Sequence, residues 1–221
     1  MRLLPLILFT FFSLISFSQG LRIDTNDLKE YEKFSIDEFG FSTEFPSNYS
    51  LDKFAPSIQL QQGNSCVGWA TTYYAMSIMY NQKFNITDFS EKEANAFDPN
   101  SIFLWDSIED YCDLGTNFND ALDVLKFKGA KKLNFFPKIV PCQNEFAFDN
   151  SMINSYVKPF AIGDIYPLSN IYSNERSYID EYGINGFKYV INKMNLPIIC
   201  AFNTPKSFDN ISSNGLWSPL I

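Results

Sequence analysis

The chain has 221 residues, of which 46% are hydrophobic and 19% charged, and its formal net charge is −8. This composition is typical of a globular protein with one large core or two packed lobes. The acidic charge argues against nucleic acid or an anionic membrane as a partner, because no basic patch is available to replace counterions.

Residues 1–18 have the pattern of a signal peptide. Arg2 is followed by the apolar run LLPLILFTFFSLISF, and Ser16 and Ser18 stand at the −3 and −1 positions of a cleavage site. We therefore expect export, to the periplasm or the medium, and leave this segment out of the fold. No later stretch approaches the ~18 consecutive apolar residues of a membrane span. Residues 19–50 show no sustained period and predict an extended N-terminal arm.

Three helices are predicted next, over residues 66–80, 101–111 and 117–128. The first follows Ser65, whose hydroxyl is suited to capping a free N–H group. The third is expected to stop at Gly129. Apolar side chains at helical spacing form a stripe along the first helix: Trp69, Ala70, Tyr73, Met76 and Tyr80. Such a stripe indicates packing rather than ligand binding.

The pattern changes after residue 150. Residues 156–168 predict extended or strand segments, 185–195 a short helix, and 196–204 a β-branched strand. Helices followed by strands, without alternation of the two, favour an α+β fold. We expect a helical lobe over residues 51–150 and a strand-rich lobe that begins at residue 151.

The stretch QLQQGNSCVGWA places Cys66 at the start of the first predicted helix. Free N–H groups and the helix dipole at that position favour a thiolate and lower the thiol pKa. A glutamine just upstream and the Cys66 N–H group are suited to holding an oxyanion. The alternative is that Cys66 is a buried free thiol or a disulfide partner. The chain has no histidine to act as base, and no Asp, Glu or Lys is placed beside Cys66 by its sequence context.

The segment QQGNSCVGWATTYYAMS resembles the active-site segment of papain-like cysteine peptidases, Gln-Gly-x-x-x-Ser-Cys-x-x-Ala, and most of all that of exported bacterial members. Two later segments resemble later parts of the same family in the same order: SIFLWDSIEDYCDLGTNFNDALDVLKFKGA and NLPIICAFNTPKSFDNISSNGLW. The resemblance covers roughly residues 50–217. It implies a two-lobe papain-like fold with an incomplete second lobe.

The resemblance also implies roles for individual residues. Cys66 would be the nucleophile and Gln61 the oxyanion donor, with Gln62 as the alternative and Gln59 as a third choice. Gly115 would line the substrate cleft. A monomer acting on peptides or proteins is implied, with no metal or organic cofactor.

In the family, the catalytic histidine and asparagine follow the segment that NGLWSP resembles. This chain stops at Ile221, so we expect a fragment of an active peptidase whose base lies further on. The alternatives are a non-catalytic exported protein that binds peptides or proteins on the same scaffold, and another thiol acyl-transfer enzyme. A fragment without its base and a non-catalytic binding protein both predict negligible peptidase activity for the 221 residues alone.

Four cysteines, Cys66, Cys112, Cys142 and Cys200, allow three pairings. Because the family's usual first cysteine is absent, the resemblance implies that Cys112 and Cys142 bridge each other, whereas Cys200 is expected to be buried in its strand. A non-reducing peptide map should recover Cys112 and Cys142 in linked peptides. Recovery of both in separate thiol-containing peptides would rule this bridge out.

Overall fold

The computed structural model describes residues 44–61, 64–105, 115–133, 160–163 and 181–200. The predicted signal peptide, most of the N-terminal arm, Cys112, Cys142 and residues 201–221 lie outside these ranges. Within them, no helix has both the length and the apolar character that crossing a membrane requires.

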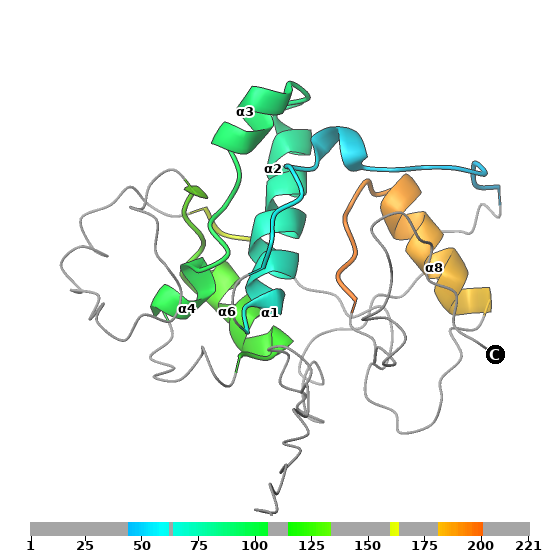
Figure 1. Ribbon diagram of the computed structural model, residues 1–221. Helices are drawn as coiled ribbons and strands as arrows, with labels where there is room; N and C mark the ends of the chain where they lie inside the picture. Colours follow the sequence, from blue (N-terminus) through cyan, green and yellow to red (C-terminus); the bar gives the residue numbers. More distant parts are fainter. Residues whose placement is uncertain (1–43, 62–63, 106–114, 134–159, 164–180, 201–221) are drawn as a thin grey trace, which may run out of the picture.

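One central helix, residues 66–83, runs through the described part of the chain. It consists of α1 (Cys66–Gly68), the π-helical η3 (Trp69–Met76) and α2 (Ser77–Lys83), which follow one another end to end (Figure 1). The prediction of this helix is confirmed, and the helix continues beyond Tyr80. The prediction that the Ser65 hydroxyl caps it is wrong. Ser65 has φ −102° and ψ 16° rather than the extended backbone that aims a capping side chain at the first turn.

The central helix is buried on several sides, and three of its buried polar side chains form hydrogen bonds with backbone groups, although Asn81 Oδ1 has no partner among the described residues. The Thr71 hydroxyl donates to the Val67 carbonyl at 2.7 Å, and Asn81 Nδ2 donates to the Phe54 carbonyl at 2.9 Å. The Ser77 hydroxyl accepts from the backbone N–H of Phe97 at 3.0 Å. Of the predicted apolar stripe, Tyr73 and Met76 are buried, whereas the other members are half-buried.

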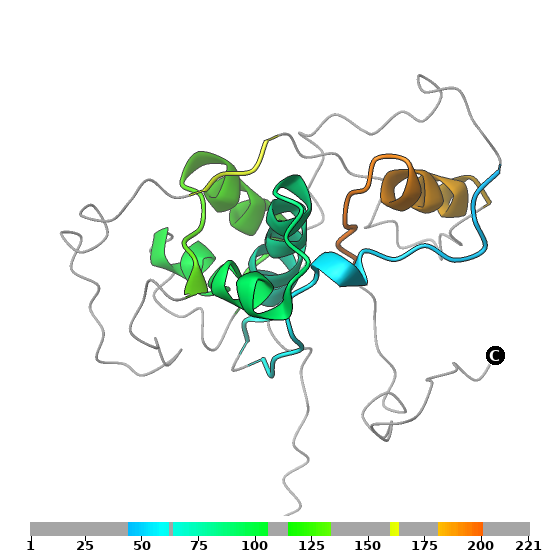
Figure 2. The same cartoon turned by 90° about the horizontal axis from the view of Figure 1, so that it is seen from above.

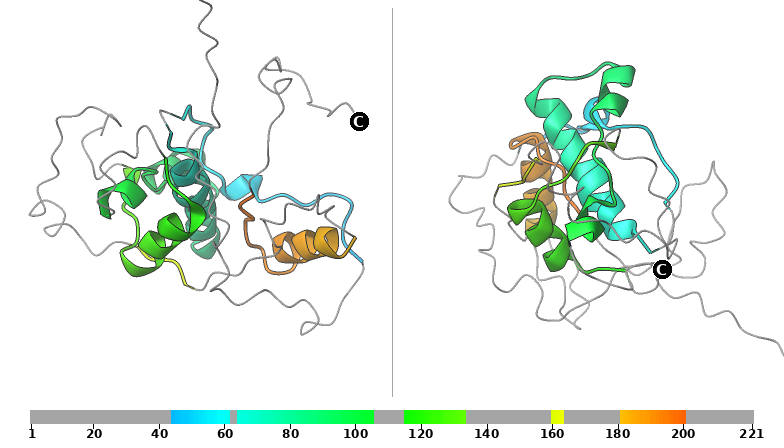
Figure 3. Two further views of the ribbon diagram at one scale, coloured as in Figure 1. Left: turned by 90° about the horizontal axis from the view of Figure 1, so that it is seen from below. Right: turned by 90° about the vertical axis from the view of Figure 1, so that its left-hand side faces the viewer.

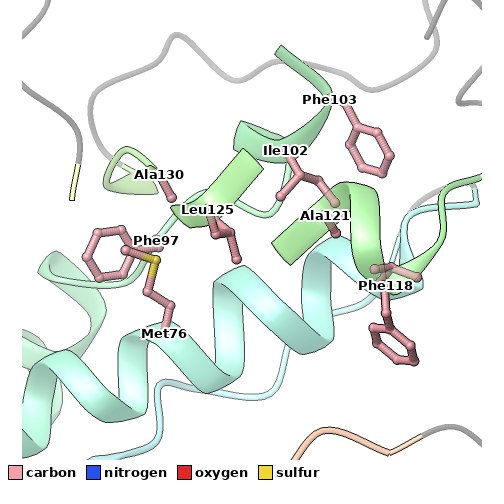
Figure 4. Close-up of a cluster of buried hydrophobic side chains, with 9 residues drawn as sticks. Met76, Phe97, Ile102, Phe103, Phe118, Ala121, Leu125 and Ala130 are labelled. Atoms are coloured by element: carbon pink, nitrogen blue, oxygen red, sulfur yellow. The ribbon is translucent and has the colours of Figure 1, made fainter. Parts of the chain in front are cut away.

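Helices α4 (Ser101–Trp105) and α6 (Phe118–Phe127) lie on one side of the central helix, and α8 (Glu181–Asn192) lies on the other (Figures 1 and 2). The hydrophobic core is between the central helix, α4 and α6 (Figure 4). Its buried members are Val67, Met76, Phe97, Ile102, Phe103, Phe118, Ala121, Leu125 and Ala130.

The predicted third helix is confirmed as α6. Its N-cap is Asn117, whose Oδ1 accepts from the Asp120 N–H at 2.8 Å, and Gly129 follows it with φ +78°. A positive φ costs little only for glycine, which explains why the helix stops there. The predicted second helix is confirmed over Ser101–Trp105; its remainder, residues 106–111, lies outside the described ranges.

A short helix that the sequence analysis missed, α3 (Phe89–Ala94), stands beyond the end of α2 (Figure 3). The Asp88 carboxylate caps it by accepting from the N–H groups of Ser90 at 2.9 Å and Glu91 at 3.1 Å. An Asp followed three residues later by Glu is a capping-box pattern, so a signal for this helix was present.

The predicted strand over residues 196–204 is wrong for the part that the structure describes, because residues 196–200 form no strand. The Leu196 N–H donates back to the Val190 carbonyl of α8 at 3.1 Å instead of to a neighbouring strand. The expectation that Cys200 is buried is also wrong, since it is exposed. The helix predicted over 185–195 is confirmed as α8, which begins earlier in the sequence.

Residues 160–163, in the predicted second lobe, lie against the helical side of the molecule. Phe160 pairs with Ala130 in an isolated antiparallel bridge, and the Ile162 N–H donates to the Leu125 carbonyl at 3.1 Å. The Phe160 ring contacts the ring of Tyr80, with 5.2 Å between centroids. In the described ranges pairing is limited to isolated bridges, so the strand-rich second lobe stays a prediction.

The close contact at Gly68 generates a stability prediction. A Cβ at this position would overlap the Pro99 carbonyl oxygen, and it would lie 3.3 Å from Ile102 Cδ1. Backbone cannot rotate away as a side chain can, so Gly68→Ala should lower the free energy of unfolding by about 1–3 kcal/mol. The measurement is the denaturant midpoint of the full chain.

Gly163→Ala is the matched control, because a Cβ there would meet nothing within 4 Å. It should change the free energy of unfolding by less than about 0.5 kcal/mol. Equal effects of the two substitutions would contradict the tight packing at Gly68.

Candidate active site

Cys66 is the first residue of α1 and is half-buried. Its side chain packs against the edge of the core, as does that of Ile199 from the segment that follows α8. The structure therefore places the predicted nucleophile at the N-terminus of the central helix. It also brings the residues just before Cys200 to the same core.

Burial raises the pKa of the Cys66 thiol above its ordinary value of 9.0. The backbone N–H groups of Val67 and of Cys66 itself bond to the sulfur and lower the pKa, but they do so by less than desolvation raises it. The expectation that the helix N-terminus gives a lowered thiol pKa is thus wrong for the arrangement described. The helix supplies the expected donors, and the apolar surroundings outweigh them.

The segment before Cys66 is tied to the central helix by hydrogen bonds. The Tyr73 hydroxyl donates to the Ser57 carbonyl at 3.1 Å, and the Gln59 N–H donates to the Tyr74 hydroxyl at 3.3 Å. Both tyrosines belong to the helix that begins with Cys66. Residues 57–61, called the glutamine segment below, and the nucleophile are therefore held on one scaffold.

The three candidate glutamines differ in their surroundings. The Gln59 side chain is exposed and donates through Nε2 to the Ser57 hydroxyl at 2.8 Å, so it takes part in fixing its own segment. Gln61 is half-buried and lies nearer to Cys66 along the chain. Gln62 lies outside the described ranges. Gln61 as the oxyanion donor, with Gln62 as the alternative, stays a prediction.

Gly115 is buried and has φ +66°, a conformation that favours glycine. It lies just before Asn117, the N-cap of α6, and α6 packs against α1. The structure thus gives Gly115 a backbone reason to be glycine. Its role in a substrate cleft stays a prediction.

A buried carboxylate that the sequence analysis did not single out is Asp98, which is 3% exposed. Burial raises its pKa, while the Asn100 backbone and side-chain N–H groups, at 2.9 and 3.0 Å from Oδ1, act in the opposite direction. These bonds shape the turn that leads into α4, which makes Asp98 a structural residue.

Within the described ranges, no group of three or more Cys, Asp or Glu residues is placed to hold a metal ion.

Comparisons of this chain with protein families, with curated proteins and with solved structures find no match.

The raised pKa of Cys66 predicts how its rate of alkylation depends on pH. Only the thiolate reacts with iodoacetamide, and a raised pKa leaves more of the thiol protonated at any given pH. The alkylation rate of Cys66 in the folded chain should therefore reach half its maximum at a higher pH than that of a free cysteine derivative.

Peptide mapping after timed alkylation measures this rate at Cys66 alone. In the denatured chain, where desolvation is lost, the midpoint should return to that of an ordinary thiol. A midpoint below the free-cysteine value in the folded chain would show that the helix N-terminus dominates instead.

Proposed function

We propose that this chain carries the nucleophile-bearing part of an exported papain-like cysteine peptidase. The observation that supports the proposal best is the position of Cys66. It begins a buried central helix whose own tyrosines anchor the glutamine segment. A nucleophile at a helix N-terminus, with an upstream glutamine segment held on the same scaffold, is an arrangement suited to acyl transfer.

In the proposed reaction, the Cys66 sulfur attacks the scissile carbonyl carbon of a bound peptide. The Gln61 side-chain amide and the Cys66 N–H group donate to the oxygen that becomes negative. The thiol proton passes to a base and then to the leaving amine, which leaves an acyl-enzyme for water to hydrolyse. In the family that the sequence resembles this base is a histidine, and the 221 residues contain none.

One observation favours the second candidate, an exported protein that binds peptides without cleaving them. The raised pKa keeps the Cys66 thiol protonated at neutral pH, and a protonated thiol is a poor nucleophile. Under this candidate the same scaffold would recognise an extended peptide, and Cys66 would be a packed residue.

Labelling of Cys66 tests both candidates. A peptidyl chloromethyl ketone should modify Cys66 at a rate that saturates with reagent concentration, because a peptide must bind first. The exposed Cys200 should be modified at a rate that rises linearly. Peptide substrates should show negligible turnover with these 221 residues.

Iodoacetamide serves as the reagent without a peptide, and Cys66→Ala as the variant without the thiol. Saturation at Cys66 with a limiting rate well above that of iodoacetamide supports the peptidase. Saturation at Cys66 with a limiting rate no higher than that of iodoacetamide supports the binding protein. A linear dependence at Cys66, equal to that at Cys200, would contradict both.

A further inference from the structure

We propose that Glu93 of α3 is a positioning residue that fixes the glutamine segment relative to Cys66. The inference rests on the proposed function, because it assigns a residue to the oxyanion side of that same site. Glu93 lies far from Cys66 in sequence, on a helix outside the segments that resemble the peptidase family, and neither candidate function assigns it a role.

The Glu93 carboxylate holds both groups with which Ser57 can donate a hydrogen bond. Glu93 Oε1 accepts from the Ser57 backbone N–H, and Oε2 accepts from the Ser57 hydroxyl at 2.9 Å. Hydrogen bonds to an ionised carboxylate are about twice as strong as those between neutral groups. Two of them from one residue also fix its orientation.

The remaining polar atoms of Ser57 are engaged as well. Its carbonyl accepts from the Tyr73 hydroxyl at 3.1 Å, and its hydroxyl oxygen accepts from Gln59 Nε2 at 2.8 Å. Tyr73 has no exposed surface, and its ring centroid lies 4.7 Å from that of Trp69. Ser57 is therefore a junction between the glutamine segment, the central helix and α3.

Packing does not hold the residues on either side of Gln59. Ile58 is 92% exposed and Leu60 is 89% exposed, so their apolar side chains bury almost nothing against the protein. Burying such a side chain fully would contribute about 1.5–3 kcal/mol, and that contribution is missing here. Hydrogen bonds therefore hold this segment, and most of those described are at Ser57, with a longer one from the Gln59 N–H to the Tyr74 hydroxyl.

Position matters on this side of the site because an oxyanion donor must meet a developing charge at hydrogen-bond distance. A displacement of about 1 Å can cost on the order of 100-fold in rate. Without the Glu93 carboxylate, Ser57 keeps only its bonds to Tyr73 and Gln59. The segment that leads to Gln61 then has more freedom, while Cys66 itself stays at the start of its helix.

A peptidyl aldehyde probes this geometry in the full 221-residue chain. The Cys66 sulfur bonds to the aldehyde carbon, and the thiol proton is transferred to the carbonyl oxygen, which gives a neutral hemithioacetal. That oxygen accepts hydrogen bonds from the oxyanion donors, which stabilise the adduct, whereas iodoacetamide alkylation, with loss of iodide, places no oxygen there. Glu93→Ala should weaken the aldehyde adduct about tenfold or more, and the iodoacetamide rate at Cys66 should stay unchanged.

Glu91→Ala is the matched control, because Glu91 lies on the same helix and its carboxylate is exposed. It should leave both reactions unchanged. Ser57→Ala leaves α3 unaltered and keeps the bond from the Ser57 N–H to Glu93, but it removes the hydroxyl's bonds to Glu93 Oε2 and Gln59 Nε2, so it should also weaken the aldehyde adduct. This variant keeps the inference testable if Glu93→Ala does not fold.

The outcomes separate the inference from the function on which it rests. If the wild-type chain forms no aldehyde adduct at Cys66, the proposed function fails and the role of Glu93 fails with it. If the wild type forms the adduct and Glu93→Ala binds the aldehyde as tightly as Glu91→Ala, the positioning role alone is overturned. Equal losses in the aldehyde and iodoacetamide reactions would mean general destabilisation and would also overturn it.

Discussion

The close approach of the 97–102 segment to the central helix is the constraint on which the rest of the structure depends. Gly68 has no Cβ, so the Pro99 backbone can touch the helix directly, and the Ser77 hydroxyl takes the Phe97 N–H out of water. The core then closes between the central helix, α4 and α6. The contact at Gly68 lies in the first turn of the central helix, two residues from Cys66.

The same packing decides the chemistry of the thiol. Two backbone N–H groups at the helix start favour the thiolate, but burial at the edge of the core removes water from the sulfur, and desolvation is the larger effect. A helix N-terminus contributes about 0.3–1 kcal/mol at an exposed position, and a partly buried thiol loses more than that in solvation. Position at a helix start is therefore insufficient to activate this cysteine. An adjacent base or cation is required.

The elements that could be predicted from sequence are those with local causes. The central helix and α6 follow from their apolar periodicity, and α6 also from the Asn117 cap and the Gly129 stop. Strand formation over residues 196–200 could not be predicted reliably, because a strand needs a partner, and β-branched residues show only that a partner would be tolerated. The thiol pKa was misjudged for the same kind of reason. The helix dipole is a local effect, whereas burial at the edge of the core depends on residues that are distant in sequence.

The bonds at Ser57 illustrate what sequence reasoning misses at the site itself. Nothing in Ser57 or Glu93 marks them as partners, since they are joined only when α3 folds back beyond α2 and the upstream segment passes beside it. Hydrogen bonds hold the glutamine segment, whose Ile58 and Leu60 are exposed, whereas Cys66 is held by its helix and by packing against the core. On the proposed function, the oxyanion side of the site is thus built by residues within this chain. The proton-transfer side would lower the thiol pKa against the cost of burial. It depends on a base, and the 221 residues contain no histidine to serve as one.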